Sequence, residues 1–321
     1  MSFNMVTVVW GKMVDWHIDY QMPSLLQPGN LPALKDANYF IYTDEPERIS
    51  AFVAKNINHL KVQVLPLTGG RGNVNACYKD CARRIQGHLA VIAPDSIFGD
   101  GSLKNLEAMC EKYDLVLFSF PRCEIGVVKE ILALLKQNKT VSNAQLVALA
   151  MPHLHREAAP PTLHLKRIAG NEWRVQHLGP TPIIRINETS LALLNSIPTN
   201  NGLLDHCVPF LCIEAGMSYH YVQSSDEVFL VEPTNRRTAF CPTDSYEGMP
   251  EWKAVAARNL EFWKDYWITW RAPESAGYIK EKKRSLGDRL WTWLGSTAHS
   301  IRIKYFPAWL SKLCLRIFYG R

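Results

Sequence analysis

The stretch HLAVIAPDSIFGDGSLKNLEAMC, residues 88–110, indicates how this chain folds. Its apolar first part is typical of a buried strand, Pro94-Asp95-Ser96 ends that strand, and GDG forms a turn before a helix that begins at Ser102. The stretch therefore predicts a single acid, Asp95, at the carboxyl end of a central strand, where open α/β sheets bind ligands. Two roles for Asp95 remain open: it shapes a turn together with Ser96, or it faces a metal ion or a nucleotide.

The same alternation of strand and helix runs through the first 120 residues. Four more runs rich in β-branched and aromatic residues predict strands at 6–10, 39–43, 59–66 and 114–120. With helical patterns between them, this order predicts an α/β fold with a doubly wound, largely parallel sheet. Trp10 and Gly11 follow the first strand and Thr43 ends the second, so all three are expected beside the ligand-binding edge.

The loops after the second and third strands contain further polar candidates. Asp44, just before Glu45-Pro46, is expected to cap the helix that follows. The glycine-rich loop at 68–73 lacks the Lys-Ser/Thr pair of a Walker loop. Arg71 in this loop and Arg83 in the next helix either face phosphates or are solvated surface charges.

Beyond residue 150 the pattern changes to shorter elements. Helices are predicted at about 124–137 and 141–151, and a helix at 15–26 is interrupted by Pro23. The segment 163–186 indicates antiparallel hairpins appended to the sheet, and Trp252 to Trp270 indicates one long aromatic helix. This region also contains acids and imidazoles suited to general-base or metal-ligand chemistry, each with a plain structural alternative: His153, His155, Asp205, His206, Asp226 and Glu227.

Length, hydrophobic content and cysteine pattern indicate a folded protein of the cytoplasm. With 321 residues, of which 47% are hydrophobic, the chain is long enough to bury a large core. It has no uncharged apolar run of membrane-spanning length and no signal-peptide pattern at its start, so we expect a cytoplasmic protein without a transmembrane helix. Its eight cysteines contain no CxxC pair and look like reduced, buried thiols, and Cys77 with Cys81 makes a poor metal site by itself.

The net charge of +6 comes from the C-terminal segment of the chain. The segment 278–321 contains ten Lys or Arg against two acids, interleaved with aromatic residues and leucines. This composition is typical of helices that lie in a membrane interface, although a helical cap on the main domain is the alternative. Binding of single-stranded nucleic acid is not expected, because no motif supports it. The residues predicted to contact an anionic membrane surface are Trp291, Trp293, Arg302, Lys304, Trp309, Lys312 and Arg316.

Several segments together resemble bacterial glycosyltransferases of the GT-A type. They are VTVVWG, PSLLQPGNLPAL, YTDEPE, the helix with Tyr78 and Ala82, and LAVIAPDSIFGDGSLKNL, within about residues 5–230. The resemblance implies a GT-A-like (Rossmann-like) mixed sheet that binds a nucleotide-sugar donor, with a DxD-type acid that holds Mn²⁺ or Mg²⁺. Asp95 is the counterpart of that motif, but Ile97 stands where the second acid is expected.

The candidate residues are given roles in such a transferase, Asp95 by the resemblance and the others by their position and chemistry. Donor binding is assigned to Trp10, Gly11, Thr43, Arg71, Tyr78, Asp95 and Ser96, metal binding to Asp95 and His155, and catalysis to Asp226, Asp205 and His153. Residues 1–275 would form the catalytic domain, with a nucleotide-binding half at about 1–150 and an acceptor half at about 151–275. Residues 276–321 would form a membrane-associating tail.

These observations predict a glycosyltransferase on the cytoplasmic face of the plasma membrane. Its acceptor would be a glycolipid or a lipid-linked glycan, such as a lipopolysaccharide or capsule precursor. Two other functions remain open. The incomplete acidic motif would permit a non-catalytic scaffold with the same fold, and a nucleotidyltransferase would share the same sheet.

Overall fold

The computed structural model describes residues 2–137, 140–154, 163–177, 181–197, 207–234 and 250–279. A seven-stranded mixed sheet forms its centre, in the order β3-β2-β1-β4-β10-β6-β11. The strands are β1 (Phe3–Val9), β2 (Ala37–Thr43), β3 (Lys61–Pro66), β4 (Gly87–Val91), β6 (Leu115–Phe118), β10 (Thr181–Ile186) and β11 (Tyr219–Tyr221). The ladders between neighbours are parallel except for the two that involve β10. The predicted α/β class and mixed sheet are therefore confirmed.

Helices cover both faces of this sheet. The helices of the described ranges are α1 (Met13–Trp16), η1 (His17–Gln21), α2 (Met22–Leu25), η2 (Leu31–Ala33), α3 (Pro46–Asn56), α4 (Val74–Arg84), α5 (Ser102–Cys110), α6 (Gly126–Lys136), α7 (Asn143–Ala150), η3 (Met151–His153), α8 (Glu188–Ser196), α9 (Val208–Glu214), α10 (Pro250–Trp263) and η6 (Glu274–Ala276). Along β1, Val6 and Val8 join one core cluster, whereas Met5 and Val9 join the other. This alternation is the period of two expected of a strand buried on both faces.

The segment 181–186 differs from its predicted place in a hairpin. It enters the main sheet as β10, antiparallel to both β4 and β6. Ile183 and Ile184 point to opposite faces and are both buried, because both faces of the sheet are covered. The hairpin prediction holds for β8 (Leu163–Ala169) and β9 (Glu172–His177).

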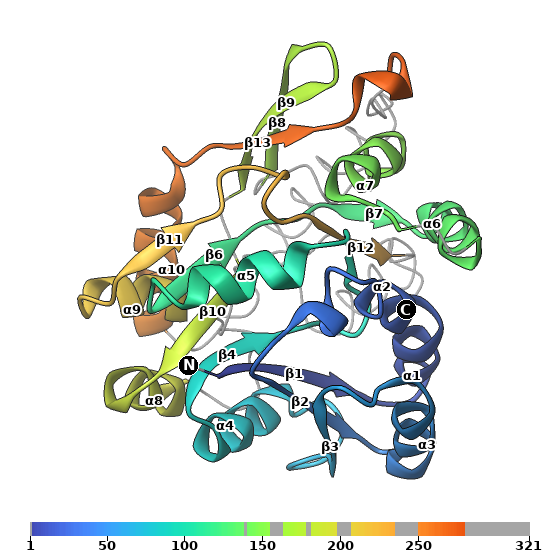
Figure 1. Ribbon diagram of the computed structural model, residues 1–321. Coiled ribbons are helices and arrows are strands. Elements are labelled where there is room, and N and C mark those ends of the chain that lie inside the picture. Colours follow the sequence, from blue (N-terminus) through green and yellow to red (C-terminus); the bar gives the residue numbers. More distant parts are fainter. Residues whose placement is uncertain are drawn as a thin grey trace, which may run out of the picture.

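The predicted long helix from Trp252 to Trp270 is wrong at its end. Helix α10 stops at Trp263, and Ile268–Arg271 forms strand β13, which pairs with β9. Ile268 and Trp270 are buried, whereas Thr269 is half-buried and Arg271 is exposed, so the segment has the period of a strand. Figure 1 shows β8, β9 and β13 at the upper end of the molecule, and β3 at the opposite end.

A second small sheet lies beyond the stretch that contains Asp95. Its strands are β5 (Ile97–Phe98), β12 (Leu230–Thr234) and β7 (Arg122–Glu124), in the order β5-β12-β7. Strand β12 is antiparallel to β5 and parallel to β7. In Figure 1, β12 lies between α2 and α7, close to the start of α6. The residues that follow Asp95 are thereby tied to a strand more than 130 positions later in the chain.

The segments PSLLQPGNLPAL and IFGDGSL bind each other through polar side chains. Gln27 donates to the carbonyl of Phe98, and Asn30 donates to the carbonyl of Gly99 and accepts from the amide of Leu103. Asp100 accepts from the amide of Gly29 at 2.6 Å. A Cβ at Gly29 would lie 2.6 Å from the backbone nitrogen of Gly101, so the two chains approach too closely for a side chain there.

The cysteines among the described residues lie in the core. Cys77, Cys81, Cys110, Cys123, Cys207 and Cys212 are buried free thiols, as predicted. Burial raises the pKa of the Cys81 thiol to about 12, so Cys77 and Cys81 are core residues of α4.

None of the helices in the described ranges has both the length and the apolar character needed to cross a membrane. From residue 280 on, the predicted basic, aromatic tail lies outside the described residues.

Candidate functional site at the carboxyl edge of the sheet

The loops after β1, β2 and β3 meet at one edge of the sheet. Gly11, with φ of +54°, donates its amide to Asp44 Oδ1 at 3.3 Å. Arg71 binds Asp44 Oδ2 from the other side, through Nε at 2.7 Å and Nη2 at 2.5 Å. Asp44 is mostly covered, whereas 67% of the Arg71 side chain is exposed. The structure therefore brings predicted donor-binding residues from two separate loops together around a shared carboxylate.

Asp44 does not cap the following helix, contrary to prediction. The N-cap of α3 is Glu45, and it makes no side-chain capping bond. The buried hydroxyl of Thr43 accepts instead from the amide of Glu45 at 3.0 Å. The helix-capping pattern in the sequence is outweighed by the two contacts of Asp44 with Gly11 and Arg71, which only the tertiary structure supplies.

Helix α4 begins at the same edge, directly after the glycine-rich loop. Its N-terminal turn makes no side-chain capping bond, and the Asn73 Oδ1 atom is buried without a hydrogen-bond partner among the described residues. Free amides at a helix N-terminus favour an anion nearby. Trp10, before Gly11, and Tyr78, in α4, are half-buried and pack against the core.

Asp95 lies in a turn four residues after β4 ends. It is partly exposed, whereas Ser96 is buried and donates its amide to the Ala93 carbonyl at 3.1 Å. The carboxylate of Asp100, the next acid along the chain, accepts from the Gly29 amide. Its carboxylate thus has a structural role in binding the two motif segments.

The small sheet adds two charged residues, Arg122, which follows the predicted strand at 114–120, and Glu232, which the sequence patterns did not single out. Arg122 Nε lies 3.4 Å from Glu232 Oε2, and Glu232 is 9% exposed. Val231 pairs with Ile97, so Glu232 lies next to the end of β5 that follows Asp95. Glu232 precedes a proline within an apolar strand, and a buried acid at such a position is a signal of function that sequence analysis missed.

Two of the predicted catalytic residues, His153 and Asp226, have charged side-chain partners, and the third, Asp205, lies outside the described part. His153 is in a 3-10 turn and not in an extended segment, and its Nε2 lies 2.8 Å from Glu130 Oε1. Asp226 lies in a turn as predicted, where it accepts from Arg271 of β13 at 2.7 Å. His153 is thus a hydrogen-bond partner of Glu130, and Asp226 is an ion-pair partner of Arg271. Asp205, His206 and His155 lie outside the described residues.

A metal site would have few protein ligands in the described part of the chain. Over these ranges, no group of three or more His, Cys, Asp or Glu side chains is placed to hold a metal ion. Asp95 fits the role of a single carboxylate ligand, with phosphate oxygens and water as the other ligands of Mg²⁺ or Mn²⁺. The metal therefore stays a prediction.

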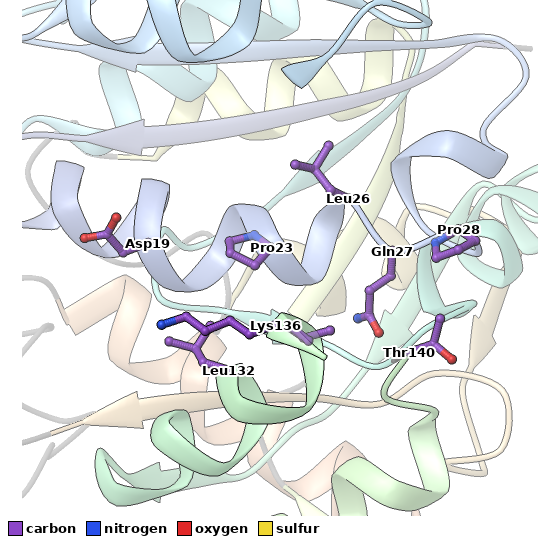
Figure 2. Close-up of a pocket in the computed structure, with 9 residues that line it drawn as sticks. Asp19, Pro23, Leu26, Gln27, Pro28, Leu132, Lys136 and Thr140 are labelled. Atoms are coloured by element: carbon purple, nitrogen blue, oxygen red, sulfur yellow. The ribbon is translucent and has the colours of Figure 1, made fainter. Parts of the chain in front are cut away.

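A cleft of about 440 Å³ opens between the α1–α2 segment and α6. Figure 2 shows Asp19 and Pro23 on one wall, facing Leu132 and Lys136 of α6. Its lining includes none of the residues predicted to bind the donor. The cleft is therefore separate from the Gly11, Asp44 and Arg71 cluster.

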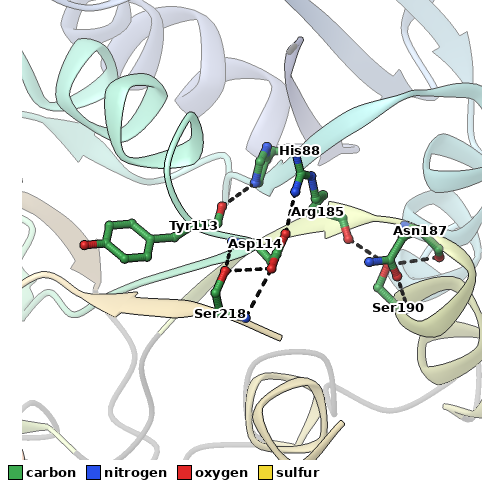
Figure 3. Close-up of polar contacts among 7 residues, drawn as sticks. All are labelled: His88, Tyr113, Asp114, Arg185, Asn187, Ser190 and Ser218. Atoms are coloured by element: carbon green, nitrogen blue, oxygen red, sulfur yellow. Dashed lines mark hydrogen bonds and ion pairs between the residues drawn. The ribbon is translucent and has the colours of Figure 1, made fainter. Parts of the chain in front are cut away.

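A second polar cluster lies at the opposite, amino edge of the sheet (Figure 3). Asp114, just before β6, accepts from Ser218 Oγ and Arg185 Nη1, each at 2.6 Å. Hydrogen bonds from Ser218 and from Arg185 lower the pKa of Asp114, and burial lowers the pKa of His88, which binds the Tyr113 carbonyl. These contacts join the ends of four strands and have a structural role.

Comparison with known proteins finds a likeness in structure and none in sequence. No protein-family model matches the chain, and no curated protein matches it. A crystal structure of S. aureus TarS in complex with UDP-GlcNAc aligns with a TM-score of 0.48 and 14% identity, over 81% of this chain and 69% of that one. The TarS complex with UDP aligns with a TM-score of 0.44 and 14% identity, over 95% and 81% of the two chains.

Proposed function

We propose that this protein is a glycosyltransferase that transfers a sugar from a nucleotide-sugar donor. The observation that carries the proposal is the polar cluster at the carboxyl edge, where the loops after β1, β2 and β3 converge on Asp44 and the next parallel strand is followed by Asp95. An open α/β sheet binds nucleotides at this edge. The resemblance of the sequence motifs to GT-A transferases supports the same assignment.

The cluster suits the parts of a nucleoside diphosphate. Arg71 and the N-terminus of α4 favour the negative charge of a diphosphate. Asp44 accepts hydrogen bonds, so it suits donors on a base or a ribose. Trp10 supplies an aromatic surface. Asp95 would hold Mn²⁺ or Mg²⁺, whose charge would stabilise the diphosphate as it leaves.

Transfer needs a group that accepts the proton of the acceptor hydroxyl. The hydroxyl oxygen forms the new bond to the anomeric carbon, the bond from that carbon to the diphosphate breaks, and the proton passes to a carboxylate or an imidazole. Asp226, Asp205 and His153 remain the candidates from the sequence. We add Glu232, because it is buried and directly follows Val231, which pairs with Ile97 beside the Asp95 loop.

The acceptor and the location belong to the same proposal. We expect a glycolipid or a lipid-linked glycan at the cytoplasmic face of the plasma membrane, because the basic, aromatic segment 278–321 has the composition of a membrane-surface helix. The second candidate is a non-catalytic scaffold of the same fold, which the lack of a second acid at Ile97 favours. A nucleotidyltransferase is not favoured, since Trp10-Gly11-Lys12 is a poor match to a phosphate-binding loop.

A thermal-shift screen tests the proposal. The ligands are UDP, GDP, CDP, ADP, dTDP and their sugar conjugates, with UDP and UDP-GlcNAc first because the TarS crystal structures contain them. A ligand at about a hundred times its Kd stabilises the native state by about 2.7 kcal/mol, which gives a rise in Tm of several degrees. We expect this rise in wild type with Mn²⁺, a clearly smaller rise in Asp95→Ala, and an unchanged rise in Asp15→Asn, which alters an exposed acid paired with Arg48. Absence of a shift with every donor would favour the scaffold.

A further inference from the structure

The chain between β4 and Asp95 has two carbonyl groups that accept hydrogen bonds from side chains, that of the buried Ile92 and that of the partly buried Ala93. Ile92 and Ala93 follow the last residue of β4, and Ile92 is 3% exposed. The amide of Ile92 still pairs with the Val6 carbonyl of β1 at 2.9 Å. A buried carbonyl without a hydrogen bond is costly, so the groups that bind these two oxygens determine the path of the loop.

The first carbonyl is bound by a pair of hydroxyl groups. Thr7 Oγ1 donates to the Ile92 carbonyl at 3.0 Å, and the Tyr39 hydroxyl lies 2.8 Å from the same Oγ1. Because the only hydroxyl hydrogen of Thr7 is used on Ile92, Tyr39 is the donor to Thr7. Burial raises the pKa of Tyr39, so its phenol keeps its proton at neutral pH.

The second carbonyl is bound by a matching pair. Gln21 Nε2 donates to the Ala93 carbonyl, and Gln21 Oε1 lies 2.6 Å from His17 Nδ1. An amide oxygen only accepts, so His17 carries its proton on Nδ1. Burial lowers the pKa of His17 to about 4, so the ring is neutral at physiological pH. The Ala93 carbonyl also accepts from the Ser96 amide, which closes the turn around Asp95.

Both members of this second pair lie in a π-helical turn. The turn η1 covers His17 to Gln21, and the amide of Met22 donates to the carbonyl of His17. Pro23 follows at once and has no amide hydrogen, so it cannot make the α-helical bond that this position would need. Turns of the π-helical type are rare in proteins, and those that occur are often found at functional sites.

We infer that Gln21, oriented by His17, and Thr7, oriented by Tyr39, are positioning residues that fix the Ile92–Ser96 loop and with it the carboxylate of Asp95. The inference rests on the proposed function for the part that concerns nucleotide binding. All four side chains are at most 1% exposed, so they act through the loop and do not touch a ligand. The His17 and Tyr39 rings lie edge to face at 6.3 Å, which places the two pairs side by side.

The first test needs no ligand. Hydrogen exchange of the peptide that covers 92–97 is measured on the full chain for wild type, Gln21→Met and Met22→Leu. Gln21→Met removes the donor to Ala93 at similar volume, and Met22→Leu alters a buried apolar neighbour on the same helix. We expect the amides of this peptide to exchange about tenfold faster in Gln21→Met than in wild type, and at the wild-type rate in Met22→Leu. Equal exchange in the two variants would overturn the inference.

Thr7 provides a second variant should Gln21→Met fail to fold. Thr7→Val is nearly isosteric and loses the donor to Ile92, whereas Thr7→Ser keeps the hydroxyl. Fast exchange at 92–97 in Thr7→Val, with wild-type exchange in Thr7→Ser, is the result expected. Fast exchange in both would show that the hydroxyl is not the group that matters, and would contradict the inference.

The second test is a double-mutant cycle on affinity for UDP with Mn²⁺, followed by GDP, CDP, ADP and dTDP. Gln21→Met should weaken binding about tenfold in wild type and should have no further effect in Asp95→Ala, because it acts through Asp95. Additive losses would overturn the inference. If wild type binds none of these nucleotides, the proposed function fails, and the exchange experiment alone decides whether the loop is held as described.

Discussion

Asp44 shows how one side chain acquires a different role when the chain folds. From sequence it is a helix cap, but in the structure it joins the Gly11 amide to the Arg71 guanidinium. The same holds for Asp100, which binds the Gly29 amide and is thereby removed from the possible metal ligands. In both cases the partner lies 27 residues or more away along the chain. Side-chain roles of this kind depend on contacts that no local pattern contains.

The buried imidazole of His17 predicts how stability depends on pH. Its pKa is about 4 in the native state against 6.5 ordinarily, so between these values the unfolded chain binds a proton that the native state does not. The free energy of unfolding should therefore fall as the pH is lowered through this window. We expect His17 to account for a loss of about 2 kcal/mol between pH 7 and pH 5, measured by urea unfolding.

Two variants isolate this contribution. His17→Gln keeps an amide donor towards Gln21 and removes the titrating group, so stability should decrease less on acidification than in wild type. His59→Gln makes the same substitution at an exposed position and should leave the pH dependence unchanged. An unaltered pH dependence in His17→Gln would mean that His17 is not the buried neutral group described.

At the scale of elements, the close fit of the motif segments explains why glycine recurs in them. A Cβ at Gly99 would lie 2.2 Å from Asn143 Oδ1 and 2.9 Å from Asn143 Cα, and Asn143 begins α7. Ser102, which opens α5, donates to the same Asn143 oxygen at 2.7 Å. The turn before α5 and the start of α7 are therefore packed against each other without room for a methyl group.

This fit gives a prediction for two glycine substitutions. Gly99→Ala should destabilise the fold by about 1 to 3 kcal/mol, because a backbone atom of α7 has to move. Gly126→Ala is the matched control: it lies in α6, where a Cβ has 3.5 Å to the His153 ring, and should stabilise by up to about 1 kcal/mol. Urea unfolding of both variants measures the difference. Equal stability of the two variants would contradict the packing described here.

At the scale of the whole molecule, the two edges of the main sheet have different roles. The carboxyl edge holds the Gly11, Asp44 and Arg71 cluster, and the amino edge holds Asp114 with its partners Arg185 and Ser218. The strands between them are largely buried on both faces. A change at the amino edge should therefore affect stability and leave ligand binding unaltered.

Asp114→Asn tests this separation. Losing the charge opposite Arg185 should cost about 1 to 2 kcal/mol of stability at pH 7, since both side chains are partly covered. The pKa of Asp114 is lowered in the native state, so its contribution is present above the unfolded pKa of about 3.9 and is lost on further acidification. The nucleotide affinity found in the thermal-shift screen should stay within about twofold of wild type. A large loss of affinity would show that the two edges are coupled.

Local patterns predicted much of this molecule. The strands at 6–10, 39–43, 59–66 and 114–120, the helices between them and the acid after β4 all appear, with small shifts in their ends. They were predictable because a strand buried on both faces needs an apolar run, and an amphipathic helix needs its own period. The end of the aromatic helix could not be predicted in this way, since Ile268–Arg271 becomes a strand by pairing with β9.

The sequence by itself determined the α/β class, the order of strands and helices, and the position of Asp95 after a central strand. Only the tertiary structure decided that β10 enters the main sheet between β4 and β6, that Asp44 joins Gly11 to Arg71, and that Glu232 lies beside the small sheet's first strand. The physical reason is the distance along the chain over which each kind of interaction acts. Propensity and periodicity act over a few neighbouring residues, whereas a strand pair or a buried ion pair joins positions that are close only after the chain has folded.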